Sequence, residues 1–243
     1  MTVSEGKSAR RLILEGGAIV LSILIAFGID AAWEERGERV RERDAVEQLI
    51  GEFELIETRL VTLDSAYEHG RFSGAAPLRE LLGVMGSEPG AFSDVRLDSL
   101  IASSLGNPRS DLPEGVLSAL VGSGQLALIQ SDSLRIALAE WAPLRETVRM
   151  DTDALAQFNA EYLLPFLWAN ASVRALDVNT RYHVELGLGP FDRNHWPLLQ
   201  SRTFENLINE RLTSLEASSG RLDEVLAHVR LVLRLLRTEA LEA

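Results

Sequence analysis

Cysteine is absent from this sequence of 243 residues, and its absence excludes several kinds of chemistry. A chain without thiols has no disulfides, no thiolate zinc site and no cysteine nucleophile. Proteins without disulfides occur on both sides of cell membranes, so the missing cysteine leaves the compartment open.

A basic surface is lacking too. The 24 lysines and arginines are outnumbered by 36 aspartates and glutamates, which gives a net charge of −12. The basic residues are also interleaved with acidic ones, as in residues 34–39. Because neutralised phosphates supply most of the affinity of a nucleic-acid binder, we expect no nucleic acid among the partners.

Recognisable catalytic and metal-binding patterns are missing as well. The histidines are scattered, and residues 183–185 and 192–195 combine one with an acidic residue in the irregular part of the chain. Neither grouping has the spacing of a metal-ligand pair on a helix, and no serine lies in a nucleophile elbow. Residues 187–190 lack the strand and helix that flank a phosphate-binding loop. We therefore predict no enzyme, no cofactor and no metal, with solvated or turn-capping roles for these histidines.

The sequence offers no alternating run typical of a β-strand and no repeat of fixed period. Its 46% hydrophobic and 25% charged residues are ordinary values for a chain that folds. Apolar residues recur instead at helical spacings of three and four. The predicted fold class is all-α.

The most apolar segment lies near the start, where only Glu15 and Asp30 are charged between Leu12 and Trp33. Each carboxylate is about 11 Å along the helix from the midpoint, within reach of the headgroups of a bilayer whose core is about 30 Å thick. The eleven Leu, Ile, Val and Phe residues contribute about −5 kcal/mol to insertion, and acids near the ends cost less than ~3 kcal/mol each. This balance predicts a tail at residues 1–11, a transmembrane helix at 12–33 and an acidic domain at 34–243.

Two alternatives for this segment are a cleaved signal peptide, with small residues near 26–28, and a buried core helix. Helix-forming sequence continues past Trp33 into a charged region, which favours an uncleaved anchor with Trp33 at the interface. Ala18, Ser22 and Ala26 form a face of small side chains that permits close helix association. Besides the lipid bilayer, the expected partner is therefore a second copy of the chain or another membrane protein.

The orientation of a membrane-spanning helix follows from the basic residues that flank it, and their numbers before and after this segment are nearly equal. Lys7, Arg10 and Arg11 precede it, and the arginines that follow it are mixed with acids. The balance leans toward an N-terminus in the cytoplasm and an extracytoplasmic domain. A cytoplasmic domain is the alternative.

The acidic domain begins and ends with long apolar seams typical of packed helices. The seam nearer the start contains Val46, Leu49, Phe53, Ile56, Leu60 and Leu63. The seam nearer the end contains Ile208, Leu212, Leu215, Ser219, Leu222, Leu226, Val229, Leu233 and Leu236, and residues 218–220 are its weak point. We expect the two helices to pack antiparallel within one chain, with His228 beside the second seam. A coiled coil between chains is the alternative.

Shorter helices are expected between the seams, near 78–85, 95–104 and 112–121. A further helix follows Ser131, with Leu134, Leu138, Trp141, Val148, Leu155 and Tyr162 on one face. Pro143 should kink or divide that helix. Periodicity fails at about 165–200, which predicts an irregular insertion.

Aromatic side chains are concentrated in and beside this insertion. They are Tyr162, Phe166, Trp168, Tyr182, Phe191 and Trp196. One interpretation is a satellite core beneath the loop. The other is a surface on which a partner docks, because Trp and Tyr dominate interface hot spots.

Residues 21–30 (LSILIAFGID) and 33–36 (WEER) resemble the opening of a family of uncharacterised bacterial single-pass membrane proteins. Residues 124–130 (GQLALIQ) resemble a mid-chain stretch of the same family. The resemblance covers about a quarter of the chain and implies an anchor and a bacterial inner membrane. It implies no activity.

The leading functional hypothesis is a membrane-anchored helical scaffold or accessory subunit. The alternative is an extracytoplasmic domain that senses a ligand and works through a separate output partner.

Overall fold

The computed structural model describes residues 5–71, 73–179 and 184–242, with side chains from residue 24 onward except at 178, 179 and 242. All regular structure in these residues is helical, which confirms the all-α prediction. The elements in chain order are α1 (Glu5–His69), α2 (Ala75–Gly83), α3 (Asp94–Ala102), α4 (Gly115–Gly122), η1 (Gln125–Leu128), α5 (Asp132–Phe158), the π-helix η2 (Asn159–Leu163), α6 (Leu164–Asn170), α7 (Val173–Asn179), η3 (Val184–Leu186), η4 (Trp196–Gln200) and α8 (Arg202–Glu242).

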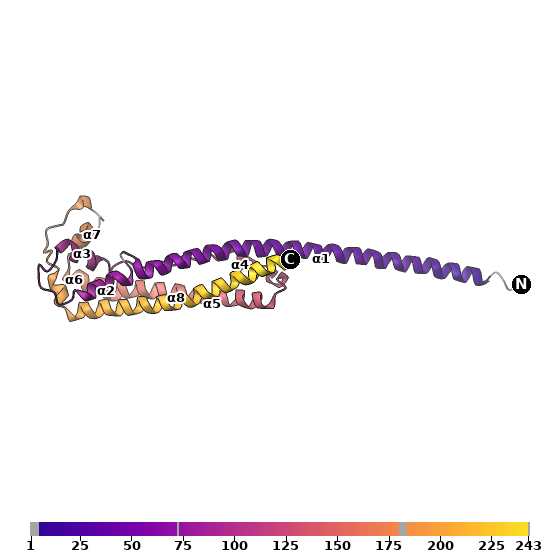
Figure 1. Cartoon of the computed structure of the whole chain (residues 1–243). Coiled ribbons are helices and arrows are strands. Elements are labelled where there is room, and N and C mark those ends of the chain that lie inside the picture. Colours follow the sequence, from indigo (N-terminus) through magenta and orange to yellow (C-terminus); the bar gives the residue numbers. More distant parts are fainter. Residues whose placement is uncertain (1–4, 72, 180–183, 243) are drawn as a thin grey trace.

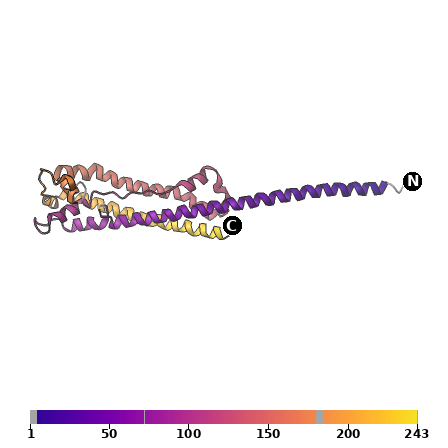
Figure 2. The ribbon, with the colours of Figure 1, turned by 90° about the horizontal axis from the view of Figure 1, so that it is seen from above.

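Helix α1 has 65 residues and is about 98 Å long at 1.5 Å per residue. It passes through Gly37 and Gly51 without a break, and its N-terminal half projects alone from one end of the bundle (Figures 1 and 2). The predicted seam of α1 is buried along its whole length, and Tyr67 extends it.

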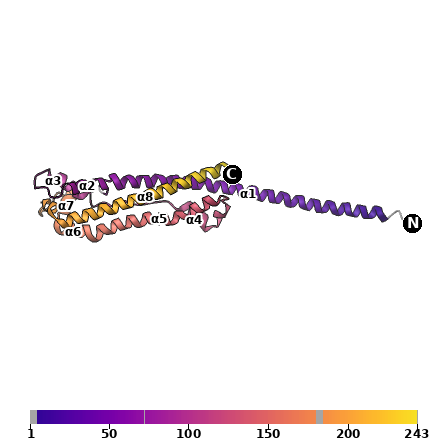
Figure 3. The same cartoon turned by 60° about the horizontal axis from the view of Figure 1, so that its bottom comes forward.

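Helix α8 lies alongside α1 and runs in the opposite direction, as the views in Figures 1 and 3 agree. Its 41 residues span about 62 Å, and α5 packs along its other side. The break that the sequence permitted at 218–220 does not occur. The Ser218 hydroxyl donates to the Ser214 carbonyl, and the Ser219 hydroxyl donates to the Asp64 carboxylate, so both polar groups are satisfied within the packed helices.

Acidic residues of α1 and α8 also form hydrogen bonds with the shorter segments at the end of the bundle from which α1 projects, here called the base. Both carboxylate oxygens of Glu52 accept backbone N–H groups, from Val116 and Leu117, at 2.9 Å each. Glu42 accepts the N–H of Gln130 at 2.9 Å, and Glu239 of α8 accepts the N–H of the next residue at 3.1 Å. These buried acids satisfy backbone N–H groups at the start of α4, whose N-cap side chain forms no such bond, and directly before α5.

The shorter helices lie close to their predicted positions, and Ser131 caps α5 by accepting the N–H of Leu134. The expectation that Pro143 divides this helix is wrong, since α5 continues through it from Asp132 to Phe158. The irregular insertion expected at 165–200 is also too long. Helices α6 and α7 occupy its first half, so helical structure continues to Asn179.

The π-helix η2 explains why Tyr162, which was expected on the buried face of the helix after Ser131, is exposed. Pro165 has no N–H for the α-helical bond to the residue four before it, and the chain widens into a π-turn just ahead of it. The extra residue shifts the register, so Asn159 and Leu163 become buried. Tyr162, expected to continue the buried face, is 56% exposed.

Candidate functional site

The end of the bundle opposite the base, here called the tip, contains α3, α6, α7, η3, η4 and the start of α8 (Figure 1). It carries the buried polar groups and the exposed aromatic residues considered below. Its exposed aromatic side chains distinguish it from the base, and for this reason the tip is the candidate functional site.

Arg211 is completely buried where α8, η2 and the turn at 105–107 meet. Its guanidinium donates to Asn159 Oδ1 at 2.5 Å and to the Gly106 carbonyl, with longer bonds to Asn107 Oδ1 and the Leu155 carbonyl. All of these acceptors are neutral. Desolvation by burial therefore lowers the pKa of Arg211 to about 10.

The same network fixes the π-turn. Asn159 Nδ2 donates to the Leu105 carbonyl at 3.1 Å and to Asn107 Oδ1 at 2.8 Å. Arg211 Nε is the one buried side-chain nitrogen or oxygen among the described residues that has no hydrogen-bond partner. The hydrogen bonds of Arg211 and Asn159 thus join α8 to the turn at 105–107, and they leave a positive charge buried away from water.

Two aspartates of α3, one turn apart, hold the stretch before α8. Asp94 accepts the indole N–H of Trp196 at 2.8 Å, and Asp98 lies 2.5 Å from His195 Nδ1. His195 Nε2 accepts the backbone N–H of Ser172 at 3.0 Å, so the proton of the neutral ring resides on Nδ1 and points at Asp98.

Of the two roles expected for this histidine, solvated or turn-capping, the solvated one is wrong, because the residue is 2% exposed, whereas its bond to the Ser172 N–H, directly before α7, fits the other. An aspartate–histidine pair is also the orienting half of a catalytic triad. Here the second ring nitrogen is already bonded to the Ser172 backbone, and that leaves it no lone pair to take a proton from a substrate. The pair therefore connects α3 to η4 and to the start of α7. His228, by contrast, flanks the α8 seam as predicted, with Nε2 2.9 Å from the Ala137 carbonyl.

A loop that projects from the tip is held by Arg174 of α7. The guanidinium donates to the Gly187 carbonyl at 2.8 Å and to the Leu186 carbonyl. Gly187 and Gly189 have φ of +62° and +78°, a conformation that other residues adopt only with strain. The held loop nevertheless exposes apolar side chains, including Leu186 and, farther along, Phe191 at 80%.

The six aromatic residues singled out by the sequence divide between the two interpretations. Phe166 stacks on Phe204 with ring centroids 5.9 Å apart, and Trp196 is 6% exposed against Phe92. These two belong to a core beneath the tip.

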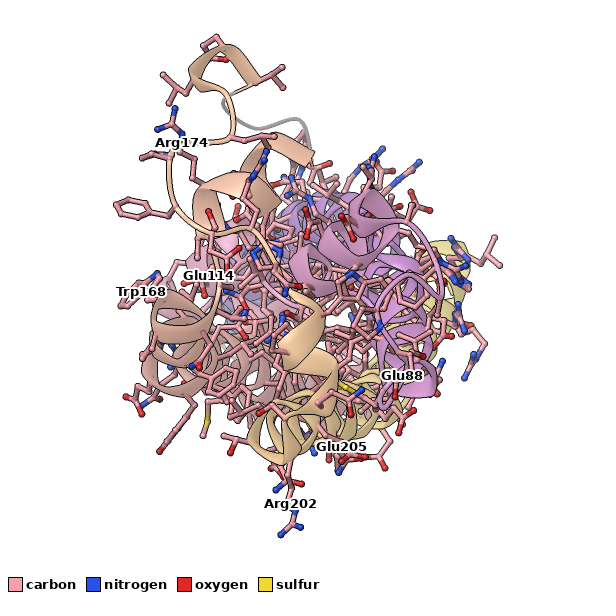
Figure 4. All side chains as sticks on the ribbon, turned by 90° about the vertical axis from the view of Figure 1, so that its left-hand side faces the viewer. Glu88, Glu114, Trp168, Arg174, Arg202 and Glu205 are labelled. Carbon is pink, nitrogen blue, oxygen red and sulfur yellow. The ribbon has the colours of Figure 1, made fainter. Side chains whose placement is uncertain are left out.

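Three others face solvent: Tyr162 at 56%, Trp168 at 66% and Phe191 at 80%. Figure 4 shows the ring of Trp168 directed away from the bundle. Tyr182 lies outside the described residues. Solvated Trp and Tyr side chains are the anchors that protein interfaces favour.

The proposed association face lies mostly beyond the described side chains. Ala18 and Ser22 precede Leu24, where the description of side chains begins, and Ala26 is exposed. In the part of the chain that the structure describes, no helix is both long and apolar enough to cross a membrane. Much of the segment predicted to span, 12–23, falls outside the described side chains.

Among the described residues no three His, Cys, Asp or Glu side chains gather in a manner that would hold a metal ion. Comparison with models of protein families, with curated proteins and with solved structures finds no match.

Sequence reasoning missed Arg211 and Asp98. The α8 seam was assigned to Leu212, yet Arg211 is buried and Leu212 is only half-buried. Position 211 stands three residues after Ile208 and four before Leu215, so its spacing also fits the seam. Asp98 had no signal, because its partner lies 97 residues away.

Proposed function

We propose that this chain is a membrane-tethered helical scaffold or accessory subunit that presents a protein-docking tip at a fixed distance from the bilayer. The observation that carries the proposal is the position of the exposed aromatic residues. Tyr162, Trp168 and Phe191 belong to η2, α6 and the loop before η4, at the end of the bundle farthest from the apolar segment of α1.

Helix α1 sets that distance. With residues 12–33 in the bilayer, the interface lies near Trp33. Glu42, at the base, is nine residues farther along the helix, or about 14 Å. His69, where α1 reaches the tip, is 36 residues farther, or about 54 Å. One uninterrupted helix from anchor to tip makes the spacing stiff.

The tip has the side chains of a docking surface. Trp168 and Phe191 are largely solvated although each would bury on the order of 150 Å² or more in an interface. The loop held by Arg174 adds Val184 and Leu186, both more than half exposed. Apolar side chains held by a positioned loop lose little entropy when a partner covers them.

A second copy of the chain fits on the back of α1. Ala26 is exposed and stands 23 residues before the buried Leu49, which at 100° per residue places it about 140° around the helix from the side that packs on the bundle. Two copies joined through the face of Ala26 would keep their bundles outside the contact.

The proposal is tested by crosslinking and mass spectrometry on the full-length protein purified from detergent-solubilised membranes. A partner should crosslink near α6 and the loop at 184–192. The double variant Trp168→Ala, Phe191→Ala should lose these crosslinks. Leu241→Ala removes an exposed apolar side chain at the base and is the control. Crosslinks that survive the tip variant, or a protein that stays soluble after membranes are pelleted, would contradict the proposal.

A further inference from the structure

A groove of about 500 Å³ runs between the junction of α5 with η2 and the first turns of α8. It is lined by Phe158, Tyr162, Thr203, Asn206, Leu207 and Glu210. The lining thus combines aromatic rings, an apolar floor and one carboxylate. We propose that this groove binds a lysine or arginine side chain of the protein that docks at the tip; this inference rests on the proposed docking function and names the chemistry of the partner.

The aromatic side of the groove is built by the π-turn. Phe158 and Tyr162 stand with ring centroids 5.6 Å apart and planes inclined by 37°. Phe158 is half-buried, whereas Tyr162 is 56% exposed, so a ring face is open to an entering group. Ring faces carry partial negative charge and attract cations within about 6 Å.

The acidic side of the groove is Glu210. No described residue forms a hydrogen bond or ion pair with it. Glu161, the nearest acid on η2, is already engaged by Gln157 at 2.8 Å. Glu210 is therefore the carboxylate that remains available to a cation lying against the rings.

Charge complementarity selects the occupant. The chain has a net charge of −12, and Arg202, the basic residue at the start of α8, points away from the bundle in Figure 4. An apolar side chain would cover the rings but leave Glu210 without a partner. A lysine or arginine side chain can contact both the apolar lining and the carboxylate, because its stem packs on Leu207 while its charged head reaches Glu210.

The test is ¹⁹F NMR of the full-length protein in detergent micelles with fluorotyrosine in place of tyrosine. The chain has three tyrosines, and the buried Tyr67 supplies an internal reference. The probes are two capped tripeptides, Gly-Lys-Gly and Gly-norleucine-Gly, which differ only in the charged head. The Tyr162 signal should shift and reach saturation as the lysine peptide is added. The dissociation constant of the norleucine peptide should be at least fivefold higher.

Variants separate the groove from general electrostatics. Glu210→Gln should weaken the lysine peptide about fivefold, and Phe158→Leu should do the same. Glu205→Gln removes an exposed acid of α8 outside the groove and should change nothing. Equal titration by both peptides, or a lysine titration indifferent to Glu210→Gln, would overturn the proposal. Tighter binding of tetramethylammonium than of the lysine peptide would overturn the assignment to a protein side chain.

Membrane insertion does not enter this titration. A negative titration would contradict cation binding in the groove but not the proposal of a tethered docking tip. Failure of the protein to pellet with membranes would contradict the tether but would not affect the titration. The two ideas can therefore fail separately.

Discussion

Replacing the buried Arg211 with methionine should destabilise the protein less than removing its uncharged partner Asn159. Burial lowers the pKa of Arg211 from its usual value to about 10, which corresponds to roughly 3 kcal/mol of desolvation at neutral pH. Its two shortest bonds, to Asn159 and to the Gly106 carbonyl, return about 1.5–3 kcal/mol each. Together the two bonds return about 3–6 kcal/mol against a desolvation cost of roughly 3 kcal/mol, so the net stabilisation by the arginine is about 0–3 kcal/mol.

Arg211→Met keeps most of the volume and removes the desolvated charge together with its bonds. Its expected cost is about 1–2 kcal/mol. Asn159→Ala leaves the charge buried without its 2.5 Å acceptor and also strips the Leu105 carbonyl of its donor. This variant should cost about 3–5 kcal/mol. The double variant should fall short of the sum by at least about 1 kcal/mol, because both changes break the same bond.

Urea unfolding of the full-length protein in micelles, followed by far-UV circular dichroism, measures both effects. With a slope of about 2 kcal/mol per molar urea, Asn159→Ala should lower the midpoint by about 2 M and Arg211→Met by less than 1 M. Arg202→Met, an exposed arginine nine residues earlier on α8, is the control and should leave the midpoint in place. The reasoning fails if Arg211→Met proves the more damaging change or if the two variants are additive.

Three further predictions concern buried polar groups elsewhere. Glu52→Gln should cost about 2 kcal/mol in the same urea assay, since an amide NH2 group, which cannot accept a hydrogen bond, replaces one of two bonded carboxylate oxygens, whereas Glu54→Gln on the exposed face should cost under about 0.5 kcal/mol. Asp98→Leu should cost about 2–3 kcal/mol by leaving the Nδ1–H of His195 buried without its acceptor, and Asp192→Asn, at an exposed turn, should be neutral. Burial raises the pKa of Tyr67, so the folded protein keeps a phenolic proton that the unfolded chain loses above pH 10. Stability should therefore fall by about 1.4 kcal/mol per pH unit above pH 10, and Tyr67→Phe should remove that part of the pH dependence.

The sequence predicted the long helices well because their apolar spacing persists over many turns. Every α1 seam residue from Val46 to Leu63 is buried, and α1 and α8 pack antiparallel as expected. The Ser131 cap could be predicted equally well, since the N–H that it accepts belongs to the residue three positions later in the chain. Local periodicity and local hydrogen bonds are written in neighbouring residues.

The tip was less predictable because its contacts are not local. Asp94 and Trp196 are 102 residues apart, and Arg211 meets the turn at Gly106 across 105. The π-turn adds a register shift that periodicity alone cannot supply, and it turned Tyr162 from an expected core residue into an exposed one. Pro165 was the available clue, because its missing N–H lies at the point where the helix widens.

The height of the tip above the bilayer is the most direct test of the tethered scaffold. The chain has no cysteine, so Glu88→Cys at the tip or Leu241→Cys at the base gives a single site for a donor dye. Energy transfer to acceptors in the headgroups of liposomes containing the full-length protein reports each distance. The dye at the base, about 14 Å from the interface, should transfer strongly, and the dye at the tip, about 54 Å away, should transfer weakly. Equal transfer from both positions, or no association with the liposomes, would contradict the account.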